Sequence, residues 1–377
     1  MSDSAKLRAI AFHLPQFHPI PENDIWWGKG FTEWTNVAKA RPQFKGHYQP
    51  QLPADLGFYD LRLPEAREAQ AALAREYGIH GFCYYHYWFN GKRLLERPVN
   101  DILSSGKPDF PFCLCWANEN WTRRWDGQER EILCAQNYSA EDDLNHIRWL
   151  IPVFRDARYI RIQGRPLFVV YRLSVFPKPE QTIELWRNEA RRQGVGDLFI
   201  CNVENFATEH ALAPKHHLDG AVEFAPDFSL LPEPQKANWL TYKLRRRPRL
   251  QRLAGELGLA QPWLINHRVF SYAEIMDKMI AKPQTSYLRF PCVTPAWDNS
   301  ARRSVEASIY HGSTPELYQK WLVAAVRQAK SNRPEDPVVF INAWNEWAEG
   351  NHLEPCQKWG RAYLEATRNA LNHSGVN

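Results

Sequence analysis

The sequence of 377 residues lacks the features that would place it in a membrane or tie it to several well-known chemistries. No apolar run approaches the roughly 20 residues of a membrane span, and Met1 to Leu7 is polar, with no signal-peptide core. There is no Walker motif, no GxSxG, no HExxH, and no Asp-x-Asp pair of the kind that binds a metal–nucleotide-sugar complex. We therefore expect a cytoplasmic chain without a transmembrane segment.

Cysteine pairs at metal-binding or redox spacing are also absent. The seven cysteines form no CxxC motif. Five of them lie in predicted strands: Cys83, Cys113, Cys115, Cys201 and Cys292. His216-His217 is an isolated pair with no ligand partner nearby in the sequence, so we predict no metal site and no cofactor. Buried free thiols are the expected state, which suits a reducing compartment.

Positive and negative side chains nearly balance: the net charge is only +5, and there is no long basic tail. The exception is Lys243 to Arg252, which reads KLRRRPRLQR. This segment could meet acidic sugars, phosphates or an anionic membrane surface, so peripheral membrane contact stays open. We interpret it as a solvated face, as charge runs usually are. A single cluster is thin support for nucleic-acid binding, and we expect none. The sequence does not indicate an oligomeric state.

Aromatic residues are abundant, with 16 Trp, 15 Tyr and 19 Phe. Many stand beside polar residues at predicted strand ends, as in a sugar-binding cleft, rather than inside apolar runs. The longest such segment, residues 14–63, is rich in Trp, Pro, Gly and Asn. Loops of that length are usually functional or disordered, and the aromatic content argues against disorder. We predict that this segment is a structured lid or wall, and that residues 15–53 border an open groove.

Short apolar runs that read as buried strands alternate with segments of helical periodicity along the whole chain. The predicted strands cover residues 9–14, 79–88, 112–116, 166–171, 198–203, 220–224, 291–295 and 338–341. Eight parallel strands joined by helical crossovers close into a (β/α)₈ TIM barrel. We therefore predict one α/β domain over residues 1–377, with long loops after strands 1 and 6, the second being a basic insertion over residues 227–290. A doubly wound open sheet is the alternative, but the first turn, Leu14-Pro15-Gln16, lacks its glycines.

Two carboxylates, Glu346 and Glu349, directly follow the last predicted strand, and Trp344 and Trp347 are interleaved with them. If the chain bends helically there, residues i and i+3 project from one side. Cleavage of a glycosidic bond needs such a pair, because one group donates a proton and the other acts as base or nucleophile. Two close carboxylates also repel, so one pKa of the pair should rise. The alternative is a polar turn whose acids cap backbone amides.

Other polar and aromatic residues also follow predicted strands, and barrel active sites lie at the carboxyl ends of the strands. Asn118-Glu119 resembles the strand-end Asn-Glu of many retaining glycosidase barrels, so Glu119 is a reserve catalytic candidate. His13 and His86 could instead be satisfied structural histidines, and Trp116, Trp121 and Trp125 could form a stacking platform. The candidate substrate-binding residues are His13, Trp34, Tyr85, His86, Trp116, Asn118, Glu119, Trp121, Glu204, Trp297, Asp298, Trp344 and Trp347.

Five longer motifs resemble those of the WbsX-type family, which is often described as glycosyltransferases of lipopolysaccharide O-antigen clusters and is related to glycoside hydrolase family 99. Together they span about residues 8 to 355. The motifs are FHLPQFH at residues 12–18, WGKGFTEW at 27–34, YYHYW at 84–88, WANENW at 116–121 and NEWAEG at 345–350.

This resemblance implies a fold and a mechanism. Family 99 enzymes are (β/α)₈ barrels that cleave α-mannosidic bonds internally with retention. Their first glutamate is thought to act as base on the 2-hydroxyl of the sugar, which gives a 1,2-anhydro intermediate, and their second as general acid/base. Carried over, Glu346 would be the base and Glu349 the acid/base. The run from Tyr84 to Trp88 differs from that of the hydrolases, so mannose specificity is not carried over.

Three hypotheses follow for an oligosaccharide or polysaccharide ligand. The first is a retaining glycosidase or transglycosylase acting on a bacterial surface polysaccharide or its lipid-linked precursor. The second is a glycosyltransferase of O-antigen assembly that uses an activated sugar donor. The third is a catalytically inactive sugar-binding barrel. The sequence does not identify the sugar, the linkage, or endo against exo action.

Overall fold

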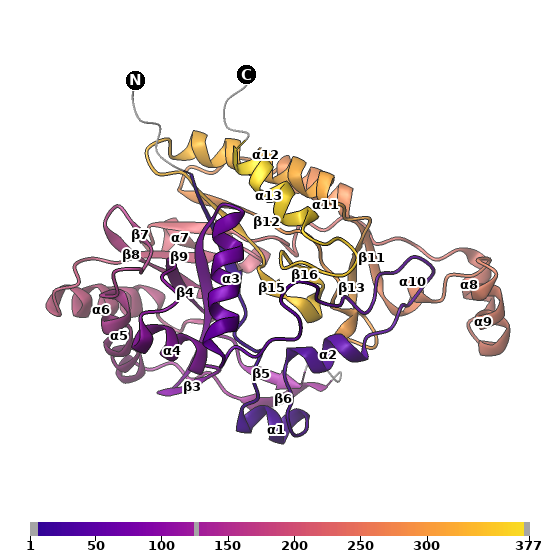
Figure 1. Ribbon diagram of the computed structural model, residues 1–377, viewed down its shortest axis with the longest axis horizontal. Helices are drawn as coiled ribbons and strands as arrows, with labels where there is room; N and C mark the ends of the chain where they lie inside the picture. The colour runs from indigo at the N-terminus through magenta and orange to yellow at the C-terminus, as the bar shows by residue number, and fades with distance from the viewer. Residues whose placement is uncertain (1–6, 124–127, 373–377) are drawn as a thin grey trace.

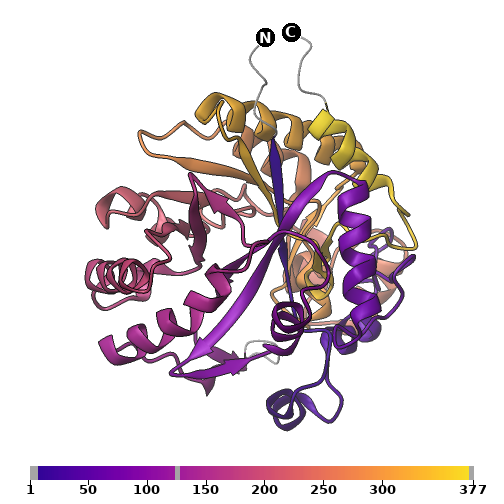
Figure 2. The ribbon, with the colours of Figure 1, turned by 60° about the vertical axis from the view of Figure 1, so that its left-hand side comes forward.

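Eight parallel strands close into a barrel in the computed structural model, which describes residues 7–123 and 128–372 (Figures 1 and 2). β1 pairs in parallel with both β2 and β14, and this double pairing closes the sheet. The predicted (β/α)₈ fold and its eight strands are confirmed. The strands are β1 (Arg8–His13), β2 (Ile79–Phe89), β4 (Phe112–Trp116), β8 (Arg165–Val170), β9 (Phe199–Val203), β10 (Gly220–Glu223), β12 (Arg289–Val293) and β14 (Val338–Ile341).

Helices cover the outside of the barrel, as Figure 2 shows. α12 illustrates why they form: Thr314 caps its first turn by accepting from the Leu317 amide, and Pro315 stands at the first helical position. Its buried stripe then packs on β12 and β14. None of the described helices is long and apolar enough to cross a bilayer. The outer helices are α3 (Pro64–Glu76), α4 (Arg97–Ser105), α5 (Ala140–Phe154), α6 (Pro179–Arg192), α7 (Leu212–Lys215), α11 (Tyr272–Ile280), α12 (Pro315–Asn332) and α13 (Ala362–Asn372).

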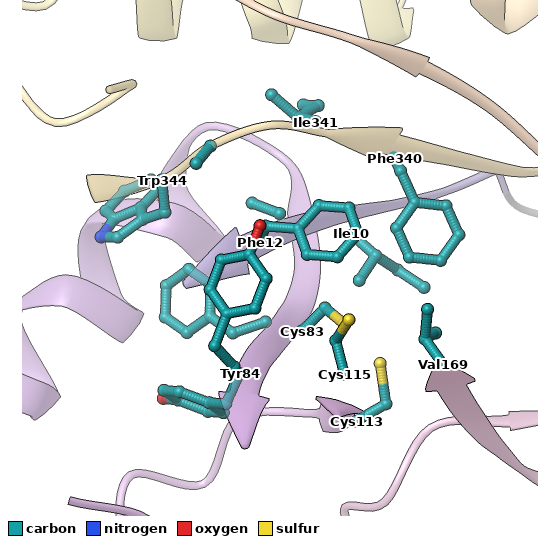
Figure 3. Packing of buried hydrophobic residues seen from close by; sticks show 14 of the residues in the cluster. Ile10, Phe12, Cys83, Tyr84, Cys113, Cys115, Val169, Phe340, Ile341 and Trp344 are labelled. Carbon is teal, nitrogen blue, oxygen red and sulfur yellow. The ribbon is translucent and has the colours of Figure 1, made fainter. Parts of the chain in front are cut away.

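The barrel interior is filled by side chains, as in a packed core (Figure 3). The Phe12 ring lies 5.6 Å from that of Tyr85, 5.3 Å from that of Phe224 and 5.6 Å from that of Phe340. The strands are buried on both faces, which explains why they read as continuous apolar runs rather than as alternating patterns. All seven cysteines are free, as predicted, and all except Cys134 are buried.

Shorter elements lie in the connections between the barrel strands and the outer helices. The 14–63 segment contains two helices, and a β-hairpin that the sequence did not predict follows β4. Besides α11, the insertion after β10 carries three short helices and a strand that pairs in parallel with β13. These elements are α1 (Pro21–Trp27), α2 (Glu33–Lys39), β3 (Lys92–Leu94), β5 (Trp121–Arg123), β6 (Gln128–Cys134), β7 (Arg161–Ile162), α8 (Trp239–Leu244), α9 (Pro248–Glu256), α10 (Trp263–Asn266), β11 (Arg268–Ser271), β13 (Ser308–His311), β15 (Asn345–Glu346) and β16 (Asn351–His352), with single 3₁₀ turns at η2 (Leu173–Val175), η3 (Ala207–Glu209), η4 (Asn299–Ala301) and η5 (Trp347–Glu349).

Candidate active site

A cavity of about 780 Å³ lies at the carboxyl ends of the barrel strands. The side chains that line it come from the ends of most strands and from the loops that follow them. They are Leu14, Gln16, Trp27, Tyr85, Tyr87, Ala117, Asn118, Glu119, Asn120, Trp121, Thr122, Leu133, Gln136, Tyr138, Tyr171, Val175, Phe224, Trp297, Arg302, Asn342, Glu346 and Glu349. The cavity occupies the position where barrel enzymes carry their active sites.

The turn after β14 brings both glutamates into this cavity. Glu346 ends β15 and Glu349 ends η5, a 3₁₀ turn. A 3₁₀ turn has three residues per turn, so residues i and i+3 stand on the same side. The predicted common projection therefore arises from a 3₁₀ turn rather than from an α-helix. Gly350 has a φ of 57°, and a Cβ there would lie 2.7 Å from Nε2 of Gln51, so the turn requires glycine.

One guanidinium holds both carboxylates. Arg302 donates from Nη1 to Oε1 of Glu349 at 2.8 Å and from Nη2 to Oε2 of Glu346 at 3.1 Å. Its Nη2 also donates to Oε1 of Glu33 at 2.6 Å, and that oxygen accepts the Ala348 amide at 3.0 Å. Glu33 is fully buried. Three carboxylates therefore converge on a single cation, and the third one also fixes the backbone between the other two.

Burial raises the pKa of Glu346 to about 8, even though Arg302 opposes this shift; Glu349 and Glu33 reinforce it. The side chain of Glu346 is 9% exposed, against 20% for Glu349. Desolvation disfavours the ionised form of a carboxyl group, and nearby negative charges add to the effect. We predicted that one pKa of the pair would rise, and Glu346 shows such a rise because its carboxyl group is buried.

A second buried acid supports this turn from behind. Glu354 accepts from the Trp347 indole at 2.6 Å, from the Tyr59 hydroxyl at 2.9 Å and from the Gln70 amide at 2.7 Å. Burial raises the pKa of Glu354 to about 7. These bonds hold the Trp347 ring away from the cavity, so the indole anchors the turn that carries Glu346 and Glu349.

Aromatic rings form much of the cavity wall. Tyr85 and Tyr87 come from β2, and Trp121 packs edge-on against Tyr87 with ring centroids 5.1 Å apart. Trp27 of the 14–63 segment and Trp297 after β12 add two indoles. Flat apolar faces of this kind pack against the C–H faces of sugar rings.

Polar groups stand beside these rings. Asn118 accepts from the Arg172 amide at 2.8 Å and donates to the Tyr138 hydroxyl at 3.0 Å. Glu119 accepts from Nη1 of Arg172 at 2.6 Å. Asn118 is therefore held in place by its neighbours, and Glu119 offers a carboxylate that is bound to a cation other than Arg302.

Seven of the predicted site residues line the cavity together: Tyr85, Asn118, Glu119, Trp121, Trp297, Glu346 and Glu349. The platform residue Trp125 lies outside the described residues. The other eight are not among the lining residues, and strand alternation explains this difference for the three that lie on barrel strands, His13, His86 and Trp116.

His13, His86 and Trp116 point from their strands toward the outer helices. Nε2 of His86 lies 3.0 Å from Nε2 of His146, and the ring stacks on Trp149 at 4.8 Å. Nε2 of His13 lies 3.2 Å from Oε1 of Gln70, and burial lowers the pKa of both His13 and His86 to about 3. The Trp116 indole donates to the carbonyl of Trp88 at 3.2 Å. These three residues therefore fill the layer between barrel and helices.

The remaining five residues are held by other partners. The Trp34 indole donates to the carbonyl of Tyr59 at 2.8 Å, and its ring packs on that of Trp347 at 5.5 Å. Trp344 is fully buried in the core (Figure 3). Glu204 accepts from the Tyr287 hydroxyl at 2.5 Å.

The side chain of Asp298 does not line the main cavity but a smaller one beside it. Its Oδ2 lies 2.6 Å from Nε2 of His47 and accepts from the Gln49 amide at 2.8 Å.

Trp344 and Trp347, the two indoles interleaved with Glu346 and Glu349, do not line the cavity and have structural positions. The aromatic wall of the cavity comes from β2 and from other loops.

Sequence reasoning did not select Arg302 or Glu33 as site residues. Glu33 lies in the WGKGFTEW motif, but the motif does not indicate that its side chain reaches the carboxylate pair. Arg302 has no local signal, since its three partners lie 44, 47 and 269 residues away. Within residues 7–123 and 128–372, no group of three or more His, Cys, Asp or Glu side chains is arranged to hold a metal ion.

The closed (β/α)₈ barrel is the fold of two solved structures. The family 99 endo-α-mannosidase of Bacteroides thetaiotaomicron superposes with a TM-score of 0.55 at 15% identity, over 97% of this chain and 96% of that one. A protein described as glycoside hydrolase-like superposes with a TM-score of 0.58 at 12% identity, over 98% and 95% of the two chains.

The family follows from the sequence. Residues 9–367 match the family described as Glycosyltransferase WbsX, and the chain belongs to this family. The uncharacterized protein WxcX of Xanthomonas campestris pv. campestris (strain B100) is 45% identical over 366 residues, which are 97% of this chain and 50% of that protein. WxcX of strain ATCC 33913 matches to the same extent. The chain thus spans about half the length of these relatives.

Proposed function

We propose that the chain acts on glycosidic bonds of a bacterial surface polysaccharide, as a retaining, family-99-like glycoside hydrolase or transglycosylase that uses Glu346 and Glu349. The observation that supports this most is that both carboxylates enter one aromatic-walled cavity and bind one guanidinium, that of Arg302. The fold it shares with the family 99 endo-α-mannosidase supports the same class of reaction.

Glu346 suits the role of base. Its carboxylate, with a pKa of about 8, is a stronger base than an ordinary glutamate. In the proposed first step it takes the proton of the sugar 2-hydroxyl, whose oxygen attacks the anomeric carbon and closes a 1,2-anhydro ring. The bond from the anomeric carbon to the leaving oxygen breaks, and that oxygen receives a proton from Glu349.

In the second step Glu349 takes a proton from water, or from the hydroxyl of an acceptor sugar. The resulting oxygen nucleophile attacks the anomeric carbon and opens the anhydro ring. Glu346 returns its proton to the 2-oxygen, so both carboxyl groups end in their starting states. Two inversions give net retention. A base that acts through the substrate's own oxygen need not touch the anomeric carbon, so the carboxyl separation of about 5 Å of ordinary retaining enzymes is not required.

The charge of the cavity supports a sugar in preference to a phosphate-bearing donor. Among the described lining residues, Glu119, Glu346 and Glu349 are acidic, and Arg302 is the one Lys or Arg. Arg302 already binds three carboxylates. The diphosphate of a nucleotide sugar would bring further negative charge into this site, where Arg302 is already bound to three carboxylates. Burying this charge in a desolvated cavity would cost free energy. A neutral glycan meets no such penalty.

A glycosyltransferase of O-antigen assembly is the second candidate, because the family to which the chain belongs carries that description. Titration calorimetry with a panel of nucleotide sugars separates the two. Binding of a nucleotide sugar, with transfer to an acceptor, would replace our first proposal, whereas the charge of the cavity leads us to expect no heat from any donor.

The principal test uses glutamine variants on two substrates with the same sugar, a glycan and an aryl glycoside with a good leaving group. Glu349→Gln should lose about 10²- to 10⁴-fold in kcat/KM on the glycan. It should lose less on the aryl glycoside, whose leaving group needs no protonation. Glu346→Gln should lose activity on both substrates, since the 2-hydroxyl must be activated in each case.

Glu119→Gln is the matched control, because Glu119 lines the same cavity but binds Arg172. We expect it to keep most of its activity on both substrates. Near-wild-type cleavage of the glycan by Glu349→Gln would refute our assignment of the acid. If Glu119→Gln alone were inactive, the role would move to Glu119. A wild-type chain that binds oligosaccharides but never gives a product would be an inactive sugar-binding barrel.

A further inference from the structure

The segment 238–260, which contains α8 and α9 and is called the basic arm below, extends from the body of the barrel at the right edge of Figure 1. It contains six Lys or Arg residues and one carboxylate, Glu256, so its net charge is +5. This equals the net charge of the whole chain, and the rest of the sequence is therefore neutral on balance. All six cations are exposed: Lys243, Arg245, Arg246, Arg247, Arg249 and Arg252.

The basic arm also exposes large apolar side chains between these cations. Trp239 is 69% exposed, Leu253 54% and Leu257 66%, and Tyr242, Leu250 and Leu259 are exposed as well. None of the nine residues of α9, all of which the structure describes, is buried. An ordinary surface helix buries an apolar stripe on its own protein. A solvated face would not place an indole and four leucines in water together with its charges.

Polar bonds, rather than these apolar side chains, hold the shape of the basic arm. Thr241 is buried, and its hydroxyl accepts the Gln261 amide at 2.7 Å. Asn238 caps α8 by accepting the Thr241 amide at 3.0 Å and donates to the carbonyl of Leu259 at 2.9 Å. Beyond the arm, Trp263 of α10 stacks on Phe44 with ring centroids 5.2 Å apart. The exposed leucines and Trp239 are therefore available to contact something outside the chain.

We infer that the basic arm binds an anionic lipid surface. Helices that lie in a membrane interface combine Lys and Arg with Trp and Leu in this way, so that the cations meet lipid headgroups while the apolar side chains enter the headgroup–acyl boundary. Charge complementarity selects an anionic surface over a zwitterionic one. A nucleic acid or another soluble polyanion would satisfy the cations but would leave the indole and the leucines in water. This inference is independent of the reaction proposed for the cavity.

The test is sedimentation of the full chain with vesicles of phosphatidylcholine, with and without phosphatidylglycerol. We expect binding to the anionic vesicles alone, and weaker binding as salt is raised. The charge variant Arg245→Glu, Arg247→Glu, Arg249→Glu should lose about a hundredfold or more in affinity. Its matched control reverses three exposed cations outside the basic arm, Lys107, Lys215 and Arg327, and has the same net charge. The control should bind like the wild type.

A second variant tests the apolar contact. Replacing Trp239, Leu253 and Leu257 by serine keeps every charge and should reduce vesicle affinity about tenfold or more. Retention on a heparin column should be unchanged, because heparin offers charge without an apolar phase. Circular dichroism and the melting temperature should match those of the wild type in all three variants, since the substituted side chains are exposed.

Three results would overturn the inference. One is a wild-type chain that stays in the supernatant with anionic vesicles. Another is an equal loss of binding in the control with Lys107, Lys215 and Arg327 reversed. The third is a serine variant that binds vesicles like the wild type, which would mean that the basic arm binds polyanions through its charge alone. If velocity sedimentation shows a dimer that the serine variant dissociates, while vesicle binding is unchanged, the apolar side chains belong to a contact between two copies.

Discussion

Replacing Glu346 by glutamine should stabilise the protein, and the gain should grow with pH. The pKa of Glu346 rises from 4.5 to about 8 on folding, because the folded chain buries the carboxyl group. Between these two values the folded state binds more protons than the unfolded state, so the stability of the wild type falls as pH rises. Glutamine resembles the protonated carboxyl group and carries no charge at any pH, so the variant lacks this loss.

The magnitude follows from the same shift. A difference of one in pKa corresponds to about 1.4 kcal/mol, so the full shift corresponds to about 5 kcal/mol between pH 4.5 and pH 8. The entropy of unfolding scales with chain length, and for a chain of this size 5 kcal/mol corresponds to about 6 °C in melting temperature. The difference in melting temperature between variant and wild type should therefore be small near pH 5 and approach that value above pH 8.

Thermal unfolding followed by circular dichroism, at a series of pH values and constant ionic strength, measures this difference directly. Glu119→Gln is the control, because it removes a cavity carboxylate whose side chain is 37% exposed. Its difference from the wild type should depend less on pH. The reasoning is refuted if the gain of Glu346→Gln is the same at pH 5 and pH 9, or if it shrinks as pH rises.

Four further predictions concern the cavity and its surroundings. A substrate with fluorine in place of the 2-hydroxyl should be neither cleaved nor trapped, because the attacking oxygen is missing; a covalent sugar adduct on Glu346 in the mass spectrum would show an ordinary glycosyl-enzyme mechanism instead. Arg302→Met should leave three carboxylates without their common cation and lower the melting temperature, in line with a cost of about 3–5 kcal/mol for breaking a buried ion pair; an unchanged melting temperature would contradict this. Trp121→Ala should raise KM about tenfold with a smaller change in kcat, because its ring is part of the cavity wall. His86→Phe should cost about 1–3 kcal/mol in unfolding free energy by leaving His146 without its partner, yet leave KM unchanged, and a raised KM would return His86 to the binding site.

The barrel could be predicted from the sequence because its strands are buried on both faces. Such strands read as short apolar runs, and prolines, glycines or polar residues mark their ends. Helices such as α12 have a cap, a proline at the first position and a regular apolar stripe. The hairpin of β5 and β6 lacked these signals. It is short and rich in charged and polar residues, so it shows no apolar run of the kind that marks the barrel strands.

The site could be predicted only in part, for two physical reasons. Both faces of β2 are buried, so Tyr85 and His86 are both surrounded by aromatic residues in the sequence. Strand alternation predicts that these two side chains point in opposite directions, but not which of them points into the barrel. The ion pair of Arg302 with Glu33 joins loops separated by 269 residues. Such a contact exists only after the barrel has closed, and no local pattern announces it. The Glu346–Glu349 spacing was visible because a single turn creates it.

The seam of the barrel has a consequence for synthesis on the ribosome. β1, β14 and β12 are neighbours in the sheet. The loops that follow these three strands supply, in the same order, Glu33, the Glu346–Glu349 pair and Arg302. β1, at the start of the chain, can therefore complete its pairing only after β14, near the end of the chain, has been synthesised. A nascent polypeptide that has not yet released β14 keeps Glu33 without its guanidinium partner and leaves the edge of β1 open. Formation of the Arg302 ion pairs thus coincides with closure of the barrel, and translation products that end before β14 should lack both.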